Sequence, residues 1–144
     1  MPSKKLNLRV ITPEAVKVEM ETDMVIMRCI TGDMGILADH EACSAVLDYG
    51  VLRILDEDDE RRMAVYGGIA QVSENLVTVL ANSAQWPGEI DHDKAEVARD
   101  DAMRRLKDED TESVDVTRDQ VLLRRSLVQL EVSSYPVLNK HTGK

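Results

Sequence analysis

The pattern of apolar residues changes period at Trp86-Pro87-Gly88, and this change constrains the fold more than any other feature of the chain. Before it, from Leu6 to about Asn82, short apolar runs alternate with polar residues, as in strands with one face toward a core. After it, apolar residues recur every three or four positions, as on one face of a helix. We therefore predict two structural units that meet near residue 87.

The first unit is predicted to be an antiparallel β-sandwich over residues 1–86. Turn signals such as Tyr49-Gly50 and Gly67-Gly68 separate its apolar runs, and no helical stretch interrupts them. Many short strands at this spacing are typical of a sandwich or barrel. Gly67-Gly68 is expected to form a bulge or corner, because glycine adopts backbone conformations that other residues avoid. With no Phe and one Trp, the core must consist mainly of aliphatic side chains and Met.

The second unit is predicted to be an antiparallel two-helix hairpin over residues 87–134. Asp91 or Asp93 is placed to cap or complement the N-terminus of the first helix, and Pro136 lies just beyond the second. A short polar joint between two amphipathic helices favours an antiparallel arrangement. We expect residues 135–144 to form a mobile tail. The apolar positions that define the two helices are Ala95, Ala98, Ala102 and Leu106, then Val116, Leu123, Leu127 and Leu130.

Composition and motifs argue against an independent enzyme or a nucleic-acid-binding protein. The formal charge is −9, with 18 Lys and Arg against 27 Asp and Glu, and such a balance disfavours binding to a phosphate backbone. The run from His40 to Ser44 begins like a zinc-protease helix but has Ser where the second histidine ligand is required. Cys29 and Cys43 lack metal-ligand spacing, and no phosphate-binding loop is present. We therefore predict no catalytic residues and no metal site.

The run from Gly32 to His40, GDMGILADH, suits a tight turn that leads into a strand. It also closely resembles the G-[DE]-x-G-I-x-P-G-H segment of the epsilon subunit of F-type ATP synthases, with Ala38-Asp39 in place of Pro-Gly. Further segments resemble that family in the same order, and Tyr49 stands where the family usually has Pro. These segments are Leu47–Ile54, Gly67–Val72, Val77–Ala81 and Glu89–Leu106.

The resemblance implies a central-stalk rotor subunit that couples rotation of the membrane c-ring to the gamma subunit and the catalytic head. Such a subunit is not itself an enzyme and requires no cofactor. It lies at the cytoplasmic face of the inner (plasma) membrane and associates with the membrane only through the complex. By motif, Asp33 corresponds to the acidic position that faces the c-ring, and His40 to the histidine near gamma.

The resemblance further implies that the hairpin can extend toward the beta subunits and inhibit ATP hydrolysis. Arg124 and Arg125 match the basic positions that face a beta subunit there, although a solvated helix face would also carry such residues. Some members of the family bind ATP as a regulatory ligand through an I/L-D-x-x-R-A motif.

Ile90, Asp91, Lys94 and Ala95 fit this ATP-binding motif, with Lys in place of Arg. Helix capping by Asp91 explains part of the same pattern without a ligand. The alternative function is therefore a nucleotide- or small-ligand-sensing module whose hairpin closes over a binding site.

Overall fold

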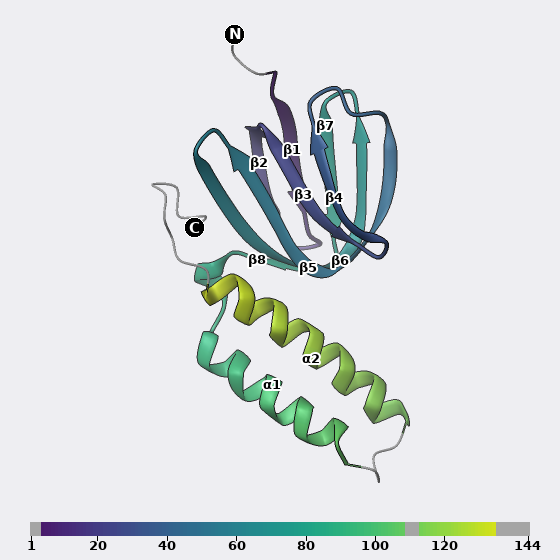
Figure 1. The fold of residues 1–144 in the computed structure, drawn as a ribbon, viewed down its shortest axis with the longest axis vertical. Coiled ribbons are helices and arrows are strands. Elements are labelled where there is room, and N and C mark those ends of the chain that lie inside the picture. The colour runs from purple at the N-terminus through teal and green to yellow at the C-terminus, as the bar shows by residue number, and fades with distance from the viewer. Residues whose placement is uncertain (1–3, 109–112, 135–144) are drawn as a thin grey trace.

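The computed structural model describes residues 4–108 and 113–134, so the expected tail at 135–144 lies outside the described residues. Within these ranges the chain forms strands first and helices afterwards (Figure 1). The strands are β1 (Leu6–Ile11), β2 (Val16–Thr22), β3 (Met24–Cys29), β4 (Gly32–Leu37), β5 (Cys43–Asp56), β6 (Asp59–Ser73), β7 (Leu76–Ala81) and β8 (Ala84–Gln85). A 3₁₀ turn, η1 (Pro87–Glu89), then leads to α1 (His92–Leu106) and α2 (Ser113–Ser134).

The strands form a curled sheet in the order β2-β1-β7-β6-β5-β3-β4, with β8 paired to β6. Neighbouring strands pair antiparallel, except that β1 runs parallel to β7. A parallel pair needs a long connection, and here the whole chain between β1 and β7 supplies it. The predicted β-sandwich is confirmed, and this one parallel pair is a feature that the alternating pattern did not indicate.

Two predicted turns lie inside long strands. β5 has 14 residues and passes through Tyr49-Gly50, while β6 has 15 residues and passes through Gly67-Gly68. The two glycines of β6 have φ of 80° and 138°, while the β5–β6 register is the same on both sides of them. A side chain on Gly68 would collide with the Leu80 carbonyl of β7. Of the expected bulge or corner, the structure therefore shows a local change of backbone direction at the two glycines, and the constant register excludes a bulge in this pair of strands.

The core of the sandwich is aliphatic, as the composition required. Its fully buried side chains come from every long strand and include Leu8, Met27, Leu52, Ile54 and Met63. Trp86, the last residue before η1, is also buried at the edge of this core. Burial of this much apolar surface is the main stabilising contribution to the sandwich.

The two helices pack antiparallel, and their contact is made by small or polar residues. Ala95 and Ala102 are buried on α1, and Ser126 and Asp119 are buried on α2. The Asp91 carboxylate accepts a hydrogen bond from the Lys94 amide at 3.1 Å, which confirms the expected N-cap. In the described parts of the chain, no helix is long and apolar enough to cross a bilayer.

The hairpin is docked against the sandwich through α2 (Figure 1). A second, smaller apolar cluster forms at this junction from Ala64 and Tyr66 of β6 and Val128 and Val132 of α2. Ile90, between η1 and α1, is partly buried against the same cluster. The structure therefore shows the hairpin folded down on the sandwich.

Candidate functional surfaces

The first predicted site residue, Asp33, lies at the start of β4, just after the turn that joins β4 to β3. Gly32 has φ of 119°, a conformation that favours glycine and lets the hairpin close tightly. Asp33 lies opposite Arg28 in the antiparallel pair, and their side chains are 3.3 Å apart and largely exposed. Because β4 is an edge strand, this turn projects from the sheet and is accessible to a partner.

His40 lies beyond the other end of β4, so the structure does not bring it together with Asp33. Leu37, the last residue of β4, is already about 13 Å from Asp33 along the strand. The His40 imidazole is exposed, with Nδ1 2.8 Å from the Glu41 carbonyl and 4.0 Å from Cys43 Sγ. An exposed imidazole that contacts its neighbour's backbone is consistent with a contact residue, and these distances show no activated thiol.

An exposed row of apolar side chains crosses the outer face of the sheet, and the sequence analysis missed it. Ile11 pairs with Leu80, Leu80 with Ile69, and Ile69 with Val46 in adjacent strands. Val16 extends the row at one end, and at the other the Ile30 amide donates to the Val46 carbonyl at 3.0 Å. We call these residues the apolar row: Val16, Ile11, Leu80, Ile69, Val46 and Ile30.

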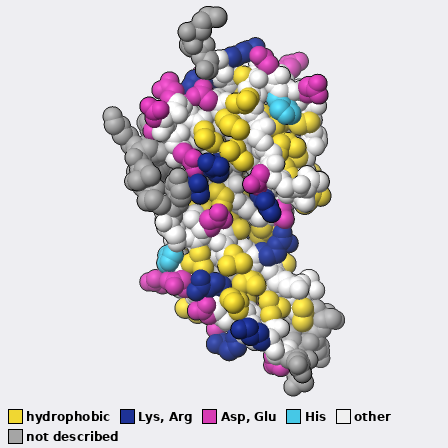
Figure 2. Space-filling model, viewed as in Figure 1, with side chains coloured by type: hydrophobic (Ala, Val, Ile, Leu, Met, Phe, Trp, Pro, Cys, Tyr) yellow, Lys and Arg dark blue, Asp and Glu magenta, His cyan; other side chains and the backbone are white. Residues whose placement is uncertain are grey.

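Five members of the apolar row are exposed despite being large and hydrophobic, with Ile30 at 64% and Val46 at 52%. Figure 2 shows apolar side chains exposed on the visible face of both units, with charged side chains between them. Contiguous apolar surface of this kind is typical of a protein contact. The signal was present in the sequence, because Val46 and Ile69 lie at outward positions where alternation predicts polar residues.

Arg124 and Arg125 both face the sandwich in this conformation. Arg124 forms an ion pair with Asp48, and its guanidinium carbon lies 5.4 Å from the centre of the Tyr49 ring. The guanidinium carbon of Arg125 lies 3.9 Å from the centre of the Tyr66 ring. The two predicted partner-contact arginines are therefore engaged within the chain while the hairpin is docked.

The predicted ATP motif lies beside a cavity of about 350 Å³ between η1, α1 and α2. Asp91, Lys94 and Ala95 line this cavity, and Arg125 lines its α2 side. Ile90 is directed instead to the apolar junction with Tyr66. The structure thus brings three of the four motif residues to one cavity, and it adds a second cation that the motif did not include.

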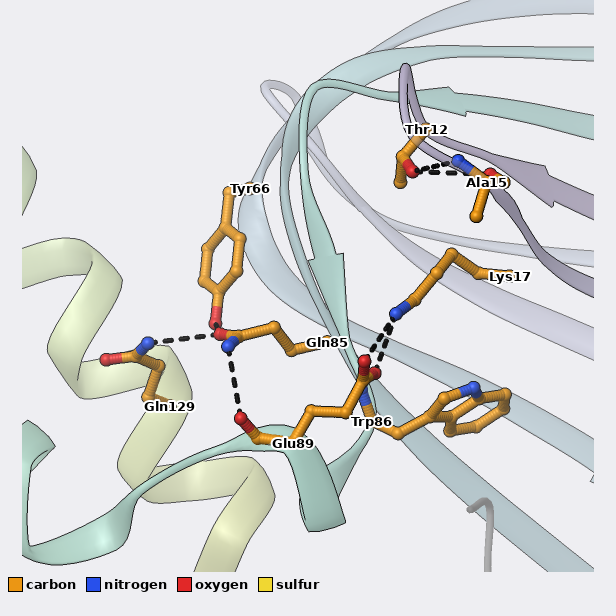
Figure 3. A network of polar contacts seen from close by, with 8 residues as sticks. All are labelled: Thr12, Ala15, Lys17, Tyr66, Gln85, Trp86, Glu89 and Gln129. Atoms are coloured by element: carbon orange, nitrogen blue, oxygen red, sulfur yellow. Dashed lines mark hydrogen bonds and ion pairs between the residues drawn. The ribbon is translucent and has the colours of Figure 1, made fainter.

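A polar network connects the sandwich to the start of the hairpin (Figure 3). The Glu89 carboxylate accepts hydrogen bonds from Lys17 Nζ at 2.7 Å and from the Trp86 amide at 2.8 Å. These bonds attach η1 to β2. On the other side, Gln85 Oε1 accepts from the Tyr66 hydroxyl at 2.5 Å and from Gln129 Nε2 at 3.1 Å.

Burial raises the pKa of Tyr66 to about 12, although the nearby positive charge of Arg125 acts in the opposite direction. The phenol therefore stays protonated and remains a hydrogen-bond donor to Gln85 at physiological pH. No group of three or more His, Cys, Asp or Glu side chains suited to a metal ion occurs among the described residues.

The sequence matches two family models in succession. Residues 5–87 match "ATP synthase, Delta/Epsilon chain, beta-sandwich domain", and residues 89–134 match "ATP synthase, Delta/Epsilon chain, long alpha-helix domain". The chain belongs to this ATP synthase family. The resemblance inferred from the motif at Gly32–His40 is therefore confirmed over nearly the whole chain.

Curated relatives in this family are named ATP synthase epsilon chain. The one from Symbiobacterium thermophilum is 39% identical over 129 residues, which cover 89% of this chain and 92% of the relative. The one from an Exiguobacterium species is 33% identical over 128 residues, covering 88% and 94%. A chain in the cryo-EM structure of the Euglena gracilis mitochondrial ATP synthase superposes with a TM-score of 0.80 at 22% identity, covering 94% of this chain and 84% of that chain. At that identity the structural likeness supports the fold.

Proposed function

We propose that this chain is the rotor subunit that links the gamma subunit to the c-ring in the central stalk of an F-type ATP synthase. It is a non-catalytic subunit, peripheral to the membrane as part of the complex. The observation that carries the proposal is the apolar row, a continuous exposed surface on a rigid sandwich. A rigid domain that binds gamma through one face and the c-ring through the β3–β4 end can transmit torque between them without catalysing a reaction.

The division of labour follows the two units. Residues 1–86 form the stalk unit, in which the apolar row and His40 contact gamma and the projecting β3–β4 turn presents Asp33 to the c-ring. Residues 87–134 form the regulatory hairpin. In an extended position, Arg124 and Arg125 would be released from the sandwich to meet an acidic segment of a beta subunit and inhibit ATP hydrolysis. A free-energy difference of only a few kcal/mol decides between two such positions of the hairpin.

Co-purification of gamma with variants of the apolar row tests the stalk role. Ile69→Asp places a charge in the middle of the row without disturbing the core, so we expect recovery of gamma to fall about tenfold or more. Val97→Asp, at an exposed valine of α1, is the matched control and should retain gamma. Normal recovery of gamma with Ile69→Asp would refute the assignment of this face.

A second function, regulation by a nucleotide, is favoured by the cavity that Lys94 and Arg125 line. Both side chains carry a positive charge that can attract phosphate oxygens, although Arg125 also contacts the Tyr66 ring in this conformation. The cavity volume lies within the usual range for small-molecule sites. Glu89 also lines it, but its carboxylate is already held by Lys17.

Calorimetry with ATP tests this second function. We expect sub-millimolar binding that weakens about tenfold in Lys94→Gln, because a phosphate contact is lost. Lys107→Gln, which removes an exposed lysine at the far end of α1, should leave the affinity unchanged. Equal binding by both variants, or no binding by the unmodified chain, would exclude an ATP site at this cavity.

A further inference from the structure

Two tyrosines face α2 from neighbouring strands of the sandwich. Tyr49 of β5 and Tyr66 of β6 are direct cross-strand partners. Their ring centres are 5.8 Å apart and the ring planes are inclined by 59°. Tilted aromatic pairs of this geometry stabilise each other and hold their faces in fixed directions. The pair therefore presents two π-faces toward the helix.

Two consecutive arginines of α2 occupy those faces. Arg124 lies over Tyr49 and Arg125 over Tyr66, at 5.4 Å and 3.9 Å from the ring centres. Consecutive helical residues diverge by about 100°, so two rings that are inclined to each other can receive them more readily than one flat surface. Asp48 completes the contact, since its carboxylate pairs with Arg124 while it also accepts from the Tyr49 amide at 2.8 Å.

Two cavities adjoin the docking interface. One of about 350 Å³ lies near α1 and is lined by Arg125, and one of about 420 Å³ lies between the sheet and α2. The second cavity is lined by Tyr49 and Val128 together with Arg28, Arg53 and Arg62 of the sheet. Between the two cavities, apolar contact is limited to the small cluster around Val128 and Val132.

We propose that Tyr49, Tyr66, Arg124 and Arg125 form an arginine latch that sets how long the hairpin stays docked on the sandwich. Cation–π contact and the Asp48 ion pair supply the specific attraction that the narrow apolar cluster lacks. The regulatory meaning of the latch rests on the proposed function, because the same arginines are those assigned to the beta subunits. Docking and contact with a beta subunit then exclude each other.

Hydrogen exchange of α2 in the isolated full chain tests the latch. Tyr49→Leu keeps an apolar side chain but removes the π-face, and we expect amide exchange across Arg124–Val132 to accelerate about threefold to tenfold. Tyr49→Phe keeps the ring and should exchange like the unmodified chain. Equal exchange in the Leu and Phe variants would overturn the proposal.

A double-mutant cycle separates the latch from a general loss of stability. Both substitutions remove the contact between Arg124 and Tyr49, and Arg124→Gln also removes the ion pair with Asp48, so the double variant should exchange little faster than Arg124→Gln alone. Arg104→Gln is the charge control, since Arg104 pairs with Asp101 within α1 and should not alter α2 exchange. Additive effects of the two substitutions would show that Arg124 and Tyr49 act independently and would overturn the latch.

The rate of ATP hydrolysis by the assembled complex distinguishes an error in the latch proposal from an error in the proposed inhibition by the hairpin. Tyr49→Leu alters only the sandwich and leaves both arginines in place, so it should release the hairpin and lower hydrolysis. Faster exchange in the isolated chain with unchanged hydrolysis would support the latch and refute inhibition by the hairpin. Unchanged exchange would refute the latch whatever the hydrolysis rate.

Discussion

The sandwich and the hairpin are stabilised in different ways. The sandwich encloses a continuous aliphatic core to which all its long strands contribute. The hairpin buries Ala95, Ala102 and Leu130 together with an Arg105–Asp119 ion pair. Among the described residues, its junction with the sandwich fully buries Ala64, Tyr66, Val128 and Val132, and partly buries Tyr49, Val51 and Ile90. Apolar burial is strong and non-directional, whereas cation–π and hydrogen-bonded contacts are weaker and can be exchanged. This contrast is what we expect of a rigid sandwich with a hairpin that can undock from it.

The largest expected effect comes from a cavity in the sandwich core. Leu52 is 2% exposed, so Leu52→Ala should lower the free energy of unfolding by about 3 kcal/mol. Leu127→Ala in α2 is the matched control, because Leu127 is 48% exposed and its loss should cost less than about 0.5 kcal/mol. Denaturant unfolding measures both, followed by Trp86 fluorescence for Leu52→Ala and by circular dichroism of the helices for Leu127→Ala, and similar losses would contradict the contrast between the two units.

A smaller effect is expected from the ion pair between the helices. Asp119 is fully buried and its Oδ1 accepts from Arg105 Nε at 2.9 Å. Arg105→Gln leaves a buried carboxylate uncompensated and should destabilise the hairpin by about 2 kcal/mol, more than Asp119→Asn does. Helix content by circular dichroism should report this loss before Trp86 fluorescence changes. Simultaneous loss of both signals would show that the two units unfold as one.

The third prediction concerns acid. Hydrogen bonds from Arg53, together with those from Arg62, lower the pKa of Glu60 to about 2. This lowered pKa stabilises the sandwich above the ordinary value of 4.5, and the stabilisation is lost as the pH falls from 4.5 through 2. At pH 7 we expect Glu60→Gln to cost about 1–2 kcal/mol. The cost should vanish near pH 2, and a pH-independent difference would contradict the ion pairs.

The smallest expected effect on the stability of the sandwich comes from removing the hairpin. A chain that ends at Ile90 retains the hydrogen bonds that Lys17 and the Trp86 amide donate to the Glu89 carboxylate. It loses the contacts made by α1 and α2. The midpoint of thermal unfolding of the sandwich should then shift by no more than a change of about 0.5 kcal/mol in the free energy of unfolding would produce. It should also still bind gamma. Failure of this shortened chain to fold would show that the hairpin contributes to the sandwich core.

Local patterns allowed much of this structure to be predicted. The change of period near Pro87, the Asp91 cap and the unusual backbone of Gly67-Gly68 in β6 all depend on a few neighbouring residues, and each is present. The Tyr49-Gly50 turn was wrong, because pairing with β6 keeps the strand extended there. Leu127, part of the predicted apolar pattern of α2, is exposed, because the buried side of α2 is formed instead by Ser126, Val128, Leu130 and Val132.

The candidate site residues also divide into those placed by neighbouring residues and those placed by contacts between distant segments. Asp33 and His40 are close in sequence, yet β4 separates them, since an extended strand carries its two ends far apart. Arg124 and Arg125 are far in sequence from Tyr49 and Tyr66, and only docking of the hairpin brings them together. The apolar row likewise comes from five strands and one turn, so no single segment reveals it.

By itself, the sequence determined the family, the change from strands to helices near Pro87 and the Asp91 cap, because these depend on motifs and on interactions between near neighbours. Only the tertiary structure decided which outward side chains form a continuous surface and what the two arginines contact. Those outcomes depend on strand register and on packing between distant segments, where weak interactions add up only after the chain has folded.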